Sequence, residues 1–125
     1  LNPILFGSEN KDAVVIRLEY GNTAVLFTGD IDSSTEKRLI NEFDTFLPAD
    51  ILKAAHHGSN TSSSLSFSRR VAAKWVIFST GMNNRFGHPE PLVIDRFRRL
   101  GTIMHNTAQD QAAVFQLDGE SVIHK

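Results

Sequence analysis

The sequence contains no cysteine, so it offers neither a disulfide framework nor a thiolate metal site, and any metal ion must be held by histidine and carboxylate side chains. No run approaches the roughly 18 apolar residues of a membrane-spanning helix. The chain also has no excess of charge of one sign, because its formal net charge is -1. A protein that binds nucleic acid mainly through a large positively charged surface would be clearly basic. The chain begins without methionine and without a basic, apolar leader, and we expect it to be a piece of a longer protein.

What the chain does contain is the composition of one globular domain. Its 125 residues are 41% hydrophobic and 22% charged, which suits a single domain, residues 1–125, with a modest core. Some basic residues cluster in spite of the neutral total. Arg85, Arg96, Arg98 and Arg99 lie close in sequence to His88.

The hydrophobic pattern predicts an α/β fold. Residues 13–20 and 23–28 read as strands around the turn Gly21-Asn22, which is typical of a β-hairpin. A helix is expected from residues 32–34, capped by Ser33 or Ser34, with Leu39, Ile40 and Phe43 on one face. Further helices are predicted at 62–73 and 91–100, and further strands at 50–55, 75–80, 102–104, 112–117 and 121–124.

Three polar motifs interrupt this pattern, each after a predicted strand. They are Thr28-Gly29-Asp30, the stretch 55–60 with its paired histidines, and Phe86-Gly87-His88-Pro89. Successive strand ends in an α/β sheet open onto one edge, where ligands collect. We therefore expect Asp30, His56, His57 and His88 to meet in one cleft.

Each of these residues also has a purely structural interpretation. Asp30 would cap the next helix, and His88 would simply occupy a loop before proline. Neighbouring residues of a strand face opposite ways, so only one of His56 and His57 would reach the site. His105 and His124 lie on or beside late strands with no partner in sequence, and for them the structural interpretation is favoured.

The serine-rich stretch 59–64 has two interpretations. It has the composition of a flexible polar loop. Its hydroxyls and free amides ahead of a predicted helix also suit a phosphate. Both interpretations stay open at this point.

The motifs together resemble a known family. The segments Thr28-Gly29-Asp30, 50–62 and Asn84–Pro89 (Asn-Arg-Phe-Gly-His-Pro) are similar to the second half of a metallo-β-lactamase-fold domain, and more narrowly to the C-terminal domain of the competence DNA-internalisation (ComEC-type) proteins. The similarity runs from about residue 10 to 116. It implies half of an αββα sandwich, with one mixed sheet and helices on one face. It also implies two Zn or Mn ions in the intact domain and hydrolysis of phosphodiesters.

The resemblance also implies roles for individual residues. Asp30 matches a metal-bridging aspartate, and His88 matches the last histidine ligand. His56 and His57 fall where related nucleases place a catalytic histidine that contacts the scissile phosphate or donates a proton, although one of them could instead bind metal. Binding of the DNA substrate is expected from the loop and the neighbouring arginine: Ser59, Asn60, Thr61 and Arg85.

One departure from the family matters more than the match. The principal ligand motif, His-x-His-x-Asp-His, belongs to the first half of such a domain and is absent from this sequence. The chain offers Asp30 and His88 out of about seven ligands, too few to close a catalytic site. Zn or Mn should therefore bind this chain weakly or not at all.

The expected function follows for the intact parent protein. It is metal-dependent cleavage of single-stranded or double-stranded DNA during uptake for natural transformation. The domain would lie outside the membrane, on the periplasmic side of a bacterial inner-membrane protein, beside the channel portion of the same chain. The alternatives are a non-catalytic module that binds or guides DNA and a hydrolase of a small phosphate or ester. The isolated chain is expected to pair sheet on sheet as a homodimer.

Overall fold

The structure is a computed structural model that describes residues 13–125, and it is a mixed α/β fold. Its main sheet has five strands in the order β1-β2-β3-β4-β5. The first pair is antiparallel and the other three pairs are parallel. The strands are β1 (Ile16–Tyr20), β2 (Thr23–Phe27), β3 (Ile51–Lys53), β4 (Trp75–Phe78) and β5 (Ile103–Asn106).

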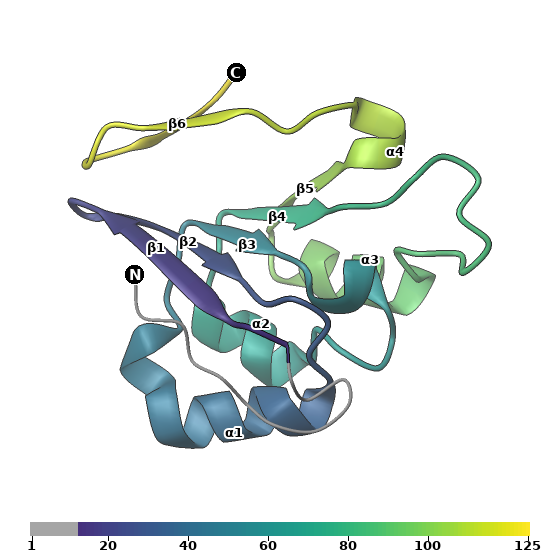
Figure 1. Cartoon of the computed structure of the whole chain (residues 1–125), viewed down its shortest axis with the longest axis horizontal. Coiled ribbons are helices and arrows are strands. Elements are labelled where there is room, and N and C mark those ends of the chain that lie inside the picture. Colours follow the sequence, from purple (N-terminus) through teal and green to yellow (C-terminus); the bar gives the residue numbers. More distant parts are fainter. Residues whose placement is uncertain (1–12) are drawn as a thin grey trace.

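Three helices cover one face of this sheet (Figure 1). They are α1 (Ser33–Phe43), α2 (Leu65–Val71) and α3 (Pro91–Arg99). One row of residues runs across the central strands, because paired positions of neighbouring strands point to the same face: Leu26, Leu52 and Val76. This row forms the buried core with Phe67 and Phe97. This arrangement confirms the predicted α/β class with one mixed sheet and helices on one face.

The opposite face of the sheet has a different cover. The strands β6 (Phe115–Leu117) and β7 (Val122–His124) form a separate two-stranded hairpin above it (Figure 1). The indole of Trp75 packs between this hairpin and the sheet, with ring centroids 5.3 Å from Phe115 and 4.6 Å from His124. The hairpin covers part of the outer face, and Phe27 on that face stays 43% exposed.

The turns of the two hairpins touch each other. The amide of Asn22 donates to the carbonyl of Gly119 at 2.6 Å. A side chain on Gly21, whose φ is +58°, would collide with the backbone of Gly119, because its Cβ would lie 2.4 Å from the Gly119 oxygen. Glycine is therefore required at position 21 for both its conformation and its contact.

Several predicted boundaries are wrong. The helix expected at 62–73 spans 65–71, because Ser63 has φ +53°, Ser64 caps the helix and Ala72 ends it in the left-handed conformation. The first helix is capped by Asp32, whose side chain accepts from the Thr35 amide, rather than by Ser33 or Ser34, or by Asp30.

Smaller differences concern the strands and short helices. The strands predicted at 50–55, 75–80, 102–104, 112–117 and 121–124 are 51–53, 75–78, 103–106, 115–117 and 122–124. Three short helical segments were not predicted: η2 (Asp44–Phe46), η3 (Ala55–Gly58) and α4 (Thr107–Asp110). Within residues 13–125, no helix has the length and hydrophobicity needed to span a membrane. Expectations about the first 12 residues lie outside the described part.

Candidate functional site

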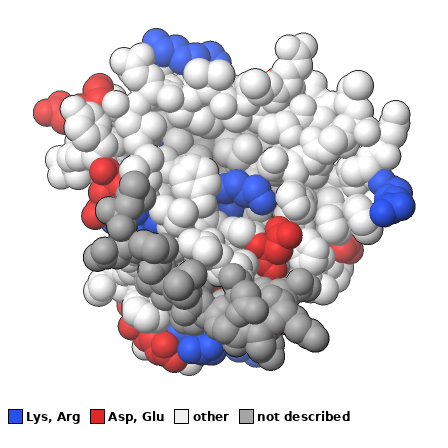
Figure 2. Space-filling view, in the orientation of Figure 1, with Lys and Arg blue, Asp and Glu red and all other residues white. Residues whose placement is uncertain are grey.

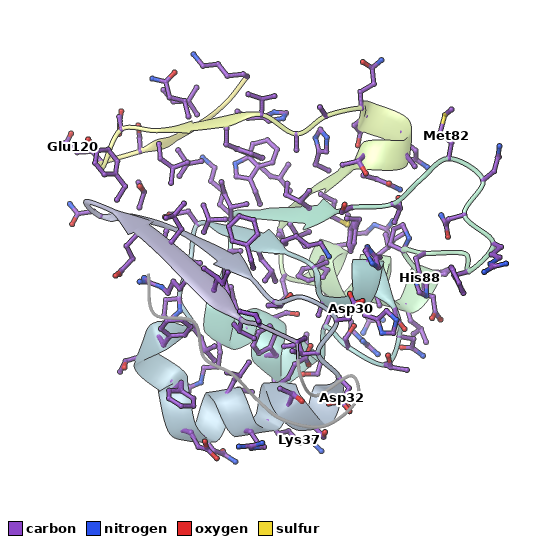
Figure 3. All side chains as sticks on the ribbon, in the orientation of Figure 1. Asp30, Asp32, Lys37, Met82, His88 and Glu120 are labelled. Atoms are coloured by element: carbon purple, nitrogen blue, oxygen red, sulfur yellow. The ribbon has the colours of Figure 1, made fainter. Side chains whose placement is uncertain are left out.

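The carboxyl ends of β2, β3 and β4 open onto one edge of the sheet, and the polar motifs follow these ends. Asp30 comes after β2, the paired histidines after β3, and His88 in the loop after β4. Figure 3 shows Asp30 and His88 on the same side of the molecule, below the loop that carries Met82. The ring of His56 lies close to both other histidines, with its centroid 6.5 Å from that of His57 and 5.9 Å from that of His88.

His57 is held in one orientation. Its Nδ1 lies 2.7 Å from the carbonyl oxygen of Ser79, at the end of β4. A carbonyl can only accept a hydrogen bond, so Nδ1 carries the hydrogen and Nε2 of the neutral ring has a free lone pair. That Nε2 lies 3.5 Å from Oδ1 of Asp30. In the neutral ring a nitrogen lone pair and a carboxylate oxygen thus face each other at the sheet edge, whereas in the protonated ring Nε2 forms an ion pair with Asp30.

The backbone at the paired histidines is unusual. His56 and His57 both adopt the left-handed conformation, with φ of 48° and 58°. Consecutive non-glycine residues rarely do so, and each costs about 1–3 kcal/mol. The backbone here is therefore not extended, so the alternation of a strand no longer determines which of the two histidines reaches the site. Both side chains are half-buried at the same edge.

The loop that carries His88 is built around Asn84. The Asn84 side chain accepts from the amide of His88 and donates to its carbonyl, both at 2.9 Å. The His88 ring stacks on Phe86 at 5.9 Å, and its Nε2 lies 3.9 Å from Glu90. Only 14% of the His88 side chain is exposed. These contacts fix the ring beside the paired histidines.

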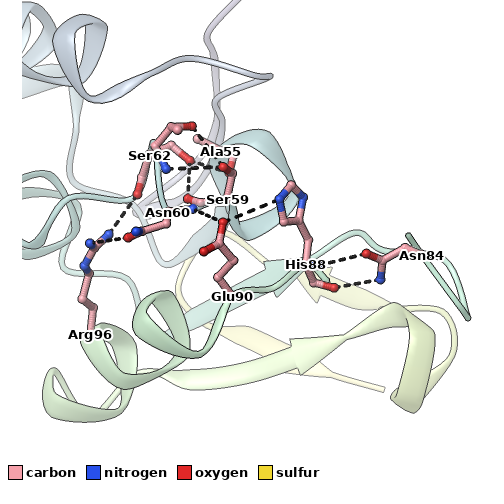
Figure 4. Close-up of polar contacts among 9 residues, drawn as sticks. Ala55, Ser59, Asn60, Ser62, Asn84, His88, Glu90 and Arg96 are labelled. Atoms are coloured by element: carbon pink, nitrogen blue, oxygen red, sulfur yellow. Dashed lines mark hydrogen bonds and ion pairs between the residues drawn. The ribbon is translucent and has the colours of Figure 1, made fainter. Parts of the chain in front are cut away.

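The stretch 59–64 is held by specific bonds, as Figure 4 shows. The Asn60 amide donates to Glu90 at 3.0 Å, and Arg96 donates to the Asn60 side chain at 2.8 Å. The same guanidinium donates to the carbonyls of Ser62 and Ser63. Figure 4 places Arg96, Asn60, Glu90 and His88 in one connected row of polar side chains. Ordered contacts of this kind replace the flexible loop that the composition suggested.

The amides ahead of α2 are not free, in contrast to the prediction. Those of Ser63 and Ser64 donate to the two oxygens of Glu36, which is fully buried. Burial is the main influence on this carboxyl and raises its pKa above 4.5, although the bonds from Ser64 and Ser63 and the nearby Arg96 act in the opposite direction. A carboxylate of the protein itself therefore occupies the position expected for a phosphate.

The predicted substrate-binding residues differ in accessibility. Ser59 is buried, and its hydroxyl bonds to that of Thr61 at 3.0 Å. Asn60 and Thr61 are exposed, but Asn60 is already paired. Arg85 is exposed and lies over the ring of Phe86 at 5.2 Å. Asn60, Thr61 and Arg85 can reach a ligand at the surface, whereas Ser59 acts within the loop.

A cavity of about 230 Å³ opens between the two fixed histidines. Its lining includes His57, Ser79, Asn84, Phe86 and His88. On the face seen in Figure 2, blue atoms form no continuous patch. A ligand in this cavity would therefore meet individual donors and acceptors rather than a broad positive field.

Lys53 supplies a positive charge close to this edge. Burial lowers its pKa from 10.5, while the charge of Asp30 raises it. Its ammonium donates to the carbonyl of Ala54 at 2.9 Å. Asp30 thus has a cation on one side and the His57 ring on the other.

Zinc and manganese both accept imidazole and carboxylate ligands, so the facing atoms of Asp30 and His57 have suitable chemistry. Over residues 13–125, however, no three histidine, aspartate or glutamate side chains converge as a metal-binding group. The described residues thus provide two facing donors with chemistry suited to a metal, and no converging set of three.

Several residues of the site were missed in the sequence. Glu36 could have been found, because it precedes Leu39, Ile40 and Phe43 at helical spacing and so falls on their apolar face. Glu90 and Arg96 carry no such signal, since their partners in the 60–63 loop are about thirty residues away.

Several known proteins are similar to this chain in sequence. No protein-family model matches the chain. It is 35% identical over 109 residues to competence protein ComA of Neisseria gonorrhoeae, covering 87% of this chain and 16% of that protein. It is 35% identical over 92 residues to ComE operon protein 3 of Bacillus subtilis, covering 74% and 12%. Recombination protein 2 of Haemophilus influenzae is 32% identical over 101 residues, covering 81% and 12%.

The matched segment is thus a small part of each relative, between 12% and 16% of its length. Identity of about one third over most of this chain, found in proteins from three bacteria, establishes homology. This chain is therefore related to the competence proteins and corresponds to one segment of them.

Proposed function

We propose that this chain is the C-terminal half of a metallo-β-lactamase-type nuclease domain that cleaves DNA during its uptake. The observation that carries the proposal is the meeting of Asp30 and His57 at the edge of the sheet, where their Oδ1 and Nε2 atoms lie 3.5 Å apart. His56 and His88 lie beside this pair. The relation to competence proteins supports DNA as the substrate.

In this proposal each residue has a defined task. Asp30 and His57 are metal ligands, and His88 is a further ligand or a contact to the phosphate. A bound Zn or Mn pair would supply a Lewis acid and an activated water for displacement at phosphorus. His56 lies beside both other rings, where an imidazolium could donate a hydrogen bond to the phosphate or a proton to the leaving oxygen. This assignment differs from the sequence-based one, in which His57 shared the catalytic role of His56.

The remaining ligands would come from another part of the parent protein. The outer face of the sheet supports this, because it retains an apolar cavity of about 260 Å³. Its lining is mainly hydrophobic: Val25, Phe27, Ile51, Ile77, Phe115 and Leu117. In the parent, the first half of the domain would pack here. Without it, we propose that a second copy of the chain covers this surface.

The relatives also guide the proposed location and partners. They are six to eight times longer than the matched segment, as the 12% to 16% coverage implies. We propose that the domain is attached to the membrane channel of the same protein, on the periplasmic side of the inner membrane. There it would meet DNA as it enters.

A non-catalytic DNA-binding or guiding module is the second candidate. It is favoured by the exposed Arg85 and Phe86 beside the site and by the incomplete set of metal donors in this chain. Hydrolysis of a small phosphate or ester would use the same 230 Å³ cavity.

The deciding experiment compares two aspartates in the full-length protein that carries this segment. Asp30 and Asp32 are neighbours in Figure 3, but Asp32 caps α1. We expect Asp30→Asn to abolish cleavage of a labelled oligonucleotide in the presence of Mn or Zn. Asp32→Asn should leave it unchanged, since asparagine also caps helices well. Binding of DNA without cleavage by the unmodified protein would favour the DNA-binding or guiding module. Cleavage of a small phosphoester, but not of DNA, would favour the small-molecule hydrolase.

A further inference from the structure

A second and larger cavity lies on the other side of His88. Its volume is about 590 Å³, within the range of roughly 300–1,000 Å³ typical of ligand sites. It lies between the loop after β4 and the segment formed by β5 and α4. Gly81, Asn84 and His88 line both this cavity and the smaller one at the candidate active site. A ligand in one cavity is thus directly adjacent to a ligand in the other.

The lining of this cavity combines an apolar floor with amides. Phe78, Ile94 and Met104 form the apolar part. Asn106 and Gln109 contribute amide groups. The Asn106 oxygen is already bonded, at 2.5 Å to the Thr80 hydroxyl and at 3.0 Å to the Ala108 amide, which leaves its NH2 group as the donor available to a ligand.

The charge of the lining argues against a phosphate. Among residues 13–125, the lining includes the carboxylate of Asp110, which accepts from the backbone amide of Asn106 at 2.8 Å, and no lysine or arginine. An anionic group would be repelled here, whereas a flat neutral ring with donors and acceptors on its edge matches both the apolar floor and the amides.

The rim carries two unusually exposed apolar side chains. Met82 is 79% exposed and Phe86 is 67% exposed, both on the loop after β4. Phe86 stacks on His88, and Arg85 lies over its ring. Aromatic rings beside arginine are the surfaces on which proteins stack the bases of single strands.

We infer that the 590 Å³ cavity binds an unpaired nucleobase of the strand whose backbone lies at the Asp30–His57 pair. The inference rests on the proposed function and adds a preference for single-stranded DNA. A base in a duplex would first have to unpair and unstack, which costs free energy. The phosphodiester would lie in the smaller cavity and the neighbouring base in the larger one, with His88 between them.

The sequence provides its own reporters for a test. Met82 and Met104 are the two methionines of the chain, and both line this cavity. Trp75, the single tryptophan, lies on the outer face of the sheet against the β6–β7 hairpin. The 125-residue chain would be labelled at the methionine methyl groups and studied by NMR without metal. The probes are the dinucleotide pTpT, the abasic deoxyribose 5-phosphate and a short blunt duplex.

We expect pTpT to shift both methionine methyl signals and to leave the Trp75 indole signal unchanged. The abasic sugar phosphate and the duplex should shift neither the methionine methyl signals nor the Trp75 indole signal. Gln109→Ala should weaken the binding of pTpT by about 2- to 12-fold, which corresponds to one lost hydrogen bond. The matched control is Gln116→Ala, an equally exposed glutamine on β6 that should have no effect.

Other outcomes would overturn the inference. Equal methionine shifts with the abasic sugar phosphate would show that the cavity recognises sugar or phosphate rather than a base. Methionine signals that stay still while pTpT shifts the His56 and His57 ring signals would reject the base site and leave the proposed nuclease site standing. If the histidine signals are also silent and the full-length protein cleaves no DNA, the proposed function itself fails.

Discussion

Gly58 packs so closely against Pro89 that a side chain on the glycine would meet the proline ring, because an added Cβ would lie 2.7 Å from the Pro89 Cβ. Gly58 follows the paired histidines, and its carbonyl accepts from the amide of Glu90 at 2.9 Å. Its φ is +89°. This contact couples the segment that carries His56 and His57 to the one that carries His88.

Gly58→Ala should therefore destabilise the fold by about 2–4 kcal/mol, because a collision is added to an unfavourable conformation. It should also displace His88. The measurement is the free energy of unfolding in urea, together with the His88 ring signals. Gly101→Ala is the matched control, since φ is +70° there but an added Cβ meets nothing within 4 Å. The control should lose about 1–2 kcal/mol. Equal losses in the two variants would contradict the proposed coupling.

The isolated chain should bind Zn or Mn weakly and should not cleave DNA. Its described residues bring Asp30 and His57 together as a pair but do not close a set of three donors. Isothermal titration calorimetry checks this, and the residual binding should disappear in Asp30→Asn and persist in Asp32→Asn. A submicromolar affinity, or cleavage of an oligonucleotide that Asp30→Ala abolishes, would refute the prediction.

His105 should matter for stability and not for turnover. It is 5% exposed, its Nε2 lies 3.1 Å from the Gln111 carbonyl, and its ring packs on His124 at 5.4 Å, away from the site. In the full-length protein, His105→Ala should cost about 1–3 kcal/mol of stability and leave the activity per folded molecule unchanged. Asp30→Ala should remove that activity. The same loss of turnover in both variants, at matched folded fraction, would show that the site is misplaced.

Glu36 should make the stability depend on pH in an uncommon direction. Burial raises its pKa in the folded state above 4.5, so the folded chain holds this proton to higher pH than the unfolded chain. Its contribution therefore falls as pH rises from 4.5 through the raised folded pKa. The unfolding free energy of the wild type, minus that of Glu36→Gln, should decrease over this window. Glu42→Gln, exposed on the same helix, is the control. An increase of this free-energy difference with pH would contradict the raised pKa of Glu36.

The isolated chain should be a homodimer that pairs through the outer face of the sheet. Phe27 is an exposed residue of that face, at 43%, and it lines the 260 Å³ apolar cavity. Phe27→Asp should give monomers in analytical ultracentrifugation. Leu92→Asp, which changes an exposed side chain on the helical side, should not. A monodisperse wild-type monomer at high micromolar concentration, without dye-accessible apolar surface, would rule out the dimer.

The sheet edge could be predicted from sequence because parallel strands end together. The apolar runs before Asp30 and His56 are unmistakable, and the rule that ligands collect where such strands end needs no further information. The conformation of the paired histidines could not be predicted, because side-chain periodicity contains no signal for a left-handed backbone. The ordered 59–64 loop was missed for another reason. Its composition is that of a mobile segment, and the groups that hold it, Glu36, Glu90 and Arg96, come from three other places in the chain.

The contact between the turns at Gly21 and Gly119 has a consequence for the order in which the protein is made. Those residues are nearly the whole chain apart, yet the Asn22 amide donates to the Gly119 carbonyl. During synthesis, the β1–β2 hairpin emerges before the β6–β7 turn and cannot make this contact until that turn has left the ribosome. We expect its turn to be open to proteases until then. Limited proteolysis of a chain ending before residue 112 should cut at 21–22 more readily than in the full chain, and equal rates would contradict this.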